Sequence, residues 1–177
     1  MSTLKVNSII PVAGVPTGGG GGIIQVKTVT KTDTFTTSST SFVDITGLSV
    51  DMTLSNSSHK ILIRYDVLFG GDFWNAGPAL LALAVDSTRI AKGTTGADDD
   101  RNSTTFQNFY ANNANNSNQN ISTSTVSFLY TPADTNSHTY KVQARMQSSN
   151  GICSVNRTGY TTDYSGISTL TIMEVSA

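Results

Sequence analysis

Short segments of alternating apolar and polar residues follow one another from Ile23 to the end of the chain, with turn-forming residues between them. Successive side chains of a strand point to opposite faces, so this alternation predicts a series of β-strands. In the clearest segment, residues 60–69, one face is apolar and the other is mixed. The apolar face holds Ile61, Ile63, Tyr65 and Val67, and the mixed face holds Leu62, Arg64, Asp66 and Leu68. We therefore expect a central strand here.

About eight to ten strands are expected in all. Their ranges are 24–30, 42–45, 48–54, 60–69, 79–85, 89–92, 103–110, 121–130, 140–146 and 167–175. Residues 79–85 are apolar throughout and also suit a helical turn, but the preceding Pro78 and the neighbouring strands favour a strand. No segment keeps helical spacing for three turns, so the sheets should be antiparallel. The sequence predicts an all-β fold, an antiparallel β-sandwich of the jelly-roll type.

The first 22 residues differ from the rest of the chain. They contain a short apolar-alternating piece with Leu4, Val6, Ile9 and Ile10, followed by an unbroken run of glycines at 18–22. Consecutive glycines have the greatest backbone freedom and no side chains to pack, so they uncouple the first apolar piece from the strands after them. We expect an anchoring arm at 1–22 and a β-head at 23–177. A disordered terminus is the alternative interpretation.

Composition indicates a weakly charged, strand-rich protein. The chain has 177 residues and a mass of 18.7 kDa, the usual size of one domain. Charged residues make up 13% of it, and Ser, Thr and Asn supply 62 positions. The net charge of -1 disfavours nucleic-acid binding. No apolar run reaches the roughly 18 residues of a membrane span, and the first ten residues do not resemble a signal peptide. We expect neither membrane insertion nor export.

Residues suited to catalysis or metal binding are few. His59 and His138 each precede a predicted strand and are interpreted as solvated turn residues. Asp98, Asp99 and Asp100 form an acidic run without the spaced carboxylates and closing Glu of an EF-hand loop, so a solvated loop is favoured over a cation site. Cys153 lies in a short apolar patch and suits the core. We therefore expect no catalytic group, metal or cofactor.

Two long polar segments carry aromatic side chains. Residues 70–78 include Phe73 and Trp74, and residues 111–120 follow Tyr110 and are rich in amides, among them Asn112, Asn113 and Asn115. Aromatic faces stack on sugar rings and amides bond to hydroxyl groups, so these residues are candidates for contact with a glycan or with another subunit. The alternative is that Trp74 fills an intersubunit core and the Asn run forms a turn.

Both ends of the chain resemble a known class of proteins. The opening STLKVNSIIP at 2–11, with its glycine-rich continuation, and the closing YSGISTLTIMEV at 164–175 resemble small virion proteins of tailed phages, cyanophages especially. The resemblance implies an N-terminal segment that attaches to the virion and a jelly-roll or tumour-necrosis-factor-like head that forms homotrimers. Exposed sheet edges and flat Thr/Ser faces also favour an oligomer.

These observations lead to one main hypothesis and two alternatives. In the main hypothesis the chain is a non-enzymatic tail-fibre or adhesin subunit of the virion, assembled in the host cytoplasm, in which Leu4, Val6, Ile9 and Ile10 anchor the arm. The first alternative is a capsid decoration protein or head fibre. The second is a carbohydrate-active enzyme, which would need two facing carboxylates among residues such as Asp66, Asp72 and Asp86.

Overall fold

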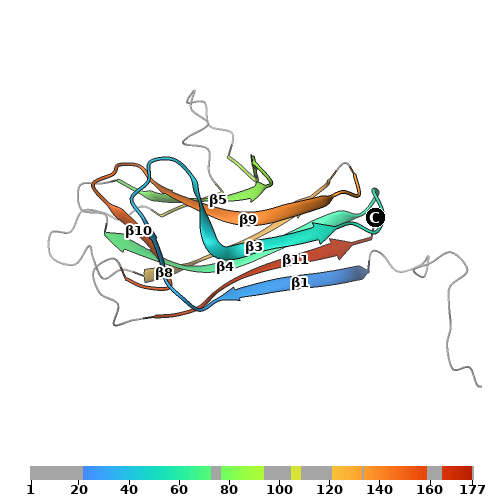
Figure 1. Cartoon of the computed structure of the whole chain (residues 1–177), viewed down its shortest axis with the longest axis horizontal. Helices are drawn as coiled ribbons and strands as arrows, with labels where there is room; N and C mark the ends of the chain where they lie inside the picture. The colour runs from blue at the N-terminus through green and yellow to red at the C-terminus, as the bar shows by residue number, and fades with distance from the viewer. Residues whose placement is uncertain are drawn as a thin grey trace, which may run out of the picture.

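The computed structural model describes residues 22–72, 77–93, 105–108, 121–132, 134–158 and 165–176. Within these ranges the chain forms strands and their connections, with no helix and hence no helix that could cross a membrane. The strands make two antiparallel sheets that stack face to face, as the layers in Figure 1 show. The predicted all-β, antiparallel sandwich is confirmed.

The first sheet is built around the long strand β4. Its strands are β1 (Ile23–Lys31), β2 (Phe35–Thr37), β4 (Lys60–Asp72), β8 (Ile121–Tyr130), β10 (Ile152–Val155) and β11 (Ser168–Val175). One edge of β4 pairs with β8, while the other pairs with β11 and then, further along, with β10. The outer positions are filled by β1, which pairs with β11, and by β2, which pairs with β10.

The second sheet lies against the first. Its strands are β3 (Val43–Thr53), β5 (Ala79–Val85), β6 (Thr88–Ile90), β7 (Phe106–Asn108) and β9 (Ser137–Met146). The order is β3-β9-β5-β6. Strand β7 pairs with the same edge of β5 as β6 does, but along residues 79–81, whereas β6 pairs along residues 83–85. In chain order, the strands of seven or more residues therefore alternate between the two sheets.

One apolar core fills the space between the sheets. The apolar face of β4, with Ile61, Ile63, Tyr65 and Val67, is fully buried there, as the alternation predicts. The mixed face of β4 points out of the sandwich. The opposing sheet contributes side chains such as Leu48, Tyr140 and Val142. At roughly 1.5–3 kcal/mol for each large apolar side chain, this burial is the main stabilising contribution to the fold.

A buried asparagine connects strands β1 and β11 of the first sheet. Asn156 lies just after β10, with a backbone φ of 61°, and its side chain is fully buried. Its Nδ2 donates to the carbonyls of Lys31 at 2.9 Å and Asp33 at 3.0 Å, and its Oδ1 accepts from the Ser168 hydroxyl at 2.6 Å. The side chain thus joins the end of β1 to the start of β11.

Several strand predictions need correction. Residues 42–45 and 48–54 were expected as two strands, but they form the single strand β3, whose register shifts between Asp44 and Ser49. Gly47 lies in this shift with a φ of 86°, a conformation that favours glycine. Strands β2 and β10 were not predicted. Of the expected strand 103–110, residues 106–108 form β7 and residues 103, 104, 109 and 110 lie outside the described residues.

Candidate functional site

The head has two distinct ends. We call the arm end the one where the chain enters the sandwich at Gly22. There the Gly22 amide donates to the Ser176 hydroxyl at 2.8 Å, and the Ser176 amide donates to the Gly22 carbonyl at 2.9 Å. Residues 1–22 and the C-terminus therefore meet the head at the same end. The proposed anchor residues Leu4, Val6, Ile9 and Ile10 lie outside the described residues.

We call the opposite end the loop end. There Asp72 pairs with Ile152, Gly70 with Ile121, and Ala79 with Asn108 and Met146. The segments 73–76 and 109–120 are thus both attached to strand ends at the loop end. They carry all six candidate contact residues, Phe73, Trp74, Tyr110, Asn112, Asn113 and Asn115, which themselves lie outside the described residues.

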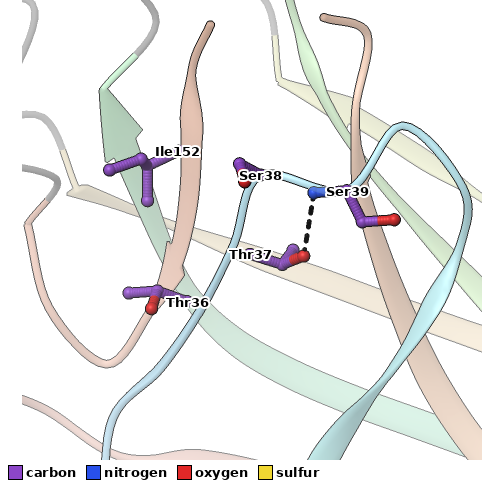
Figure 2. Close-up of a pocket in the computed structure, with 5 residues that line it drawn as sticks. All are labelled: Thr36, Thr37, Ser38, Ser39 and Ile152. Carbon is purple, nitrogen blue, oxygen red and sulfur yellow. Dashed lines mark hydrogen bonds between the residues drawn. The ribbon is translucent and has the colours of Figure 1, made fainter. Parts of the chain in front are cut away.

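A hollow of about 480 Å³ opens at the loop end, beside Asp72. It is lined by Thr36, Thr37, Ser38, Ser39 and Ile152, and Figure 2 shows these side chains on β2, the segment after it and β10. The Ser39 amide donates to the Thr37 hydroxyl at 3.0 Å. The lining is uncharged, with hydroxyl groups and one exposed apolar side chain. Such a surface can exchange hydrogen bonds with a polyhydroxyl ligand while Ile152 contacts its apolar face.

The hollow was not predicted because the two strands that form it, β2 and β10, were not predicted. Phe35, Thr36 and Thr37 give only one apolar residue in three, too little alternation to predict a strand. The hollow forms only because β2 pairs with β10, over one hundred residues further along the chain.

A buried carboxylate closes the arm end. Glu174 has no exposed surface, and its Oε1 accepts from the Ser55 amide at 2.8 Å, the Ser55 hydroxyl at 2.6 Å and His59 Nδ1 at 2.6 Å. Its Oε2 accepts from Gln25 Nε2. Burial alone would raise the pKa of Glu174, but the hydrogen bonds from Ser55, Gln25 and His59 outweigh it and lower this pKa to about 2.

This Ser, His and Glu cluster does not have the geometry of a nucleophilic triad. In such a triad the acid binds one ring nitrogen and the serine hydroxyl binds the other. Here Ser55 donates directly to the carboxylate, and its hydroxyl lies 3.4 Å from the same His59 nitrogen that Glu174 binds. The contacts therefore tie the β3–β4 turn to β1 and β11 instead of activating a nucleophile.

His138 is held between two carboxylates at the same end. Its Nδ1 lies 2.7 Å from Asp86 and its Nε2 lies 2.9 Å from Asp134. Carboxylates accept hydrogen bonds, so both contacts favour the protonated ring, and these hydrogen bonds to Asp86 and Asp134 raise the pKa of His138. The prediction that both histidines are merely solvated turn residues was wrong: the side chains of His59 and His138 are only 16% and 21% exposed, and each binds a carboxylate.

The remaining sequence candidates are dispersed. Asp66 points outward from the first sheet and binds Arg64, whereas Asp86 lies in the β5–β6 turn of the second sheet, so these two carboxylates do not face each other. The Asp72 side chain lies outside what the structure describes, as do Asp98, Asp99 and Asp100. Cys153 is fully buried in the core, as predicted. Among the described residues, no group of three or more His, Cys, Asp or Glu is placed to hold a metal ion.

A scan against models of known protein families finds no match, and a search of curated proteins finds no significant match. The described fold defines a structural class only: an antiparallel β-sandwich that residues 1–21 join at one end and the segments 73–76 and 109–120 join at the other.

Proposed function

We propose that this chain is a non-enzymatic structural subunit of a phage virion, a tail fibre or adhesin, whose N-terminal arm attaches to the particle and whose β-head contacts the host surface. One observation carries the proposal: the arm and the candidate contact segments join the head at opposite ends. A subunit that must reach from a particle to a cell needs this polarity.

The dimensions of the head fit this role. Strand β8 has ten residues, which at about 3.3 Å per residue separate the two ends by roughly 30 Å. The alternation of consecutive long strands between the two sheets supports a jelly roll. The continuous core gives the head rigidity, so the loop end keeps a fixed distance from the arm end.

The loop end offers a surface suited to a glycan. The hydroxyl-lined hollow lies next to the strand end that leads into Phe73 and Trp74. Hydroxyl groups both donate and accept hydrogen bonds, and aromatic side chains stack on sugar rings, so together they suit a neutral polysaccharide of the host envelope.

Anchoring is tested by incorporation into particles. Replacing Leu4, Val6, Ile9 and Ile10 by Ser should leave a folded head that is absent from purified virions, because the arm loses its apolar contacts. A control with Lys5, Asn7 and Ser8 changed to Ala keeps those contacts and should incorporate normally. Incorporation of the serine variant at the normal level would contradict the anchor.

Location and host contact are tested separately. Negative-stain images of virions with a labelled chain should show the label on the tail, and label on the capsid facets would instead indicate a decoration protein. The purified chain should bind host cells and compete with phage adsorption, and Trp74→Ala should weaken both effects. Thr53→Ala, at the arm end, serves as the control. Equal binding by both variants would contradict a contact surface at the loop end.

A further inference from the structure

The exposed apolar side chains are concentrated on one sheet. Each of the large apolar residues that the described part of the chain exposes lies in the first sheet or directly beside it. They are Ile23, Ile24, Val26, Ile121, Leu129, Ile152 and Ile167. Val26 is 54% exposed and Leu129 is 50% exposed. Scattered single residues of this kind are ordinary on a protein surface, whereas apolar side chains that adjoin one another on one face mark an interaction site.

The strand register places two of these exposed residues, Val26 and Leu129, in one continuous apolar row. Val26 pairs with Met173, Met173 with Leu62, and Leu62 with Leu129. This apolar row crosses β1, β11, β4 and β8 on the outer face of the sheet, near the arm end. Ile24 in β1 extends the exposed apolar surface beyond the row.

The outer face of the second sheet has the opposite character. Lys141 and Gln143 donate to Asp44 at 2.8 and 2.7 Å, and the Thr139 hydroxyl donates to Asp51 at 2.6 Å. Charged and hydrogen-bonded side chains of this kind are typical of a surface in contact with water. The two outer faces of one sandwich therefore differ, and only the first is suited to burial.

The polar part of the first face is complementary to itself. Next to the apolar row lie two further rows, Thr28-Thr171-Arg64-Ser127 and Thr30-Thr169-Asp66-Thr125. Hydroxyl groups match other hydroxyl groups, since each can donate and accept. Arg64 and Asp66 supply one charge of each sign, at 3.0 Å from each other. A copy of this face can therefore offer Asp66 to Arg64 without repulsion, whereas a strongly charged partner would find few counter-charges.

We propose that this outer face of the first sheet packs against a second copy of the chain, with Val26, Met173, Leu62 and Leu129 in the contact. Burying the row removes apolar area from water at about 25 cal/mol per Å². The inference is independent of the proposed function, because it rests on the face alone.

Analytical ultracentrifugation of the full chain tests the proposal. The wild type should sediment as an oligomer, and Val26→Lys and Leu129→Lys should lower its mass at least about two-fold. Both side chains are half exposed, so the circular dichroism spectrum of the variants should remain that of the folded wild type. Ser137→Lys adds the same charge on the second sheet and should leave the oligomer intact. A monomeric wild type, or lysine variants that assemble normally, would overturn the proposal.

Hydrogen exchange distinguishes a second copy from the chain's own N-terminal segment. Amides of β1 and β8 should lose protection as the full chain is diluted, because dilution dissociates copies. Protection that does not change on dilution, in a monomer, would assign the face to residues 1–21 of the same chain and overturn the proposal.

Discussion

The buried carboxylate of Glu174 should make the stability of the head depend strongly on acid pH. Glu174 accepts hydrogen bonds from Ser55, His59 and Gln25 and has no exposed surface. Glu174→Gln keeps the shape of the side chain but removes its charge and turns an NH₂ group toward these donors. We expect the variant to be less stable than the wild type at pH 6, because hydrogen bonds to a charged group contribute about 1.5–3 kcal/mol.

The magnitude comes from the pKa of Glu174. Folding lowers this pKa from 4.5 to about 2. A group with a lowered pKa stabilises the fold above its unfolded pKa, and this stabilisation is lost as the pH falls toward the folded pKa. Lowering the pKa from 4.5 to about 2 corresponds to about 3 kcal/mol of stability, of which about 2 kcal/mol is lost by pH 3.

Urea unfolding of the wild type and Glu174→Gln at a series of pH values between 6 and 3 measures this loss. The difference in unfolding free energy between the two proteins should shrink by about 2 kcal/mol over this range. Asp66→Asn is the matched control, because Asp66 is also paired but is partly exposed, so its difference from the wild type should change less. A gap between wild type and Glu174→Gln that is the same at pH 6 and pH 3 would refute the reasoning.

Three other side chains of the head give further predictions. Asn156→Ala leaves the carbonyls of Lys31 and Asp33 without their donor and puts Ala at a φ of 61°. It should therefore lower the unfolding free energy in urea titrations by about 3 kcal/mol, whereas Asn156→Gly, which tolerates that φ, should lower it less. The raised pKa of His138 stabilises the fold below pH 6.5, and this contribution is lost as the pH rises through the raised pKa. His138→Gln should therefore lower the unfolding free energy more at pH 6 than at pH 9, and equal losses at the two pH values would contradict the ion pairs. Burial raises the pKa of the Cys153 thiol, so a thiol reagent should modify it only as fast as the head unfolds, and immediate labelling of the native protein would contradict its place in the core.

Local patterns were sufficient to predict the strands with continuous alternation or continuous apolar character. Strands β5 and β8 have the predicted bounds, and β4 begins at Lys60 as predicted and extends three residues further than predicted. The failures have a non-local cause. Strands β2 and β10 are only three and four residues long. They are strands because they pair with each other, with β2 in line with β1 and β10 in line with β11 along β4. No local signal carries that information.

The site residues divide in the same way. The segments that hold Trp74 and Tyr110 could be found as polar, aromatic-bearing stretches between predicted strands. The Glu174 cluster could not, because Gln25 and Ser55 are 149 and 119 residues away from it in the sequence. His59 looked like a turn residue because its partner is supplied by the last strand. Turn chemistry is visible locally, but burial and hydrogen-bond partners depend on the tertiary fold.

The separation of the two ends has a thermodynamic consequence. Strands β1 and β11 run antiparallel, which brings Gly22 and Ser176 together, whereas β4 ends and β8 begins at the other end of the sheet. With roughly 30 Å of strand between them, changes at the two ends share no partners and should add within about 0.5 kcal/mol. The loss of stability in Glu174→Gln combined with Ile152→Ala should therefore equal the sum of the single losses. A large coupling energy would mean that the ends are not independent, and that contact at the loop end would disturb the arm end.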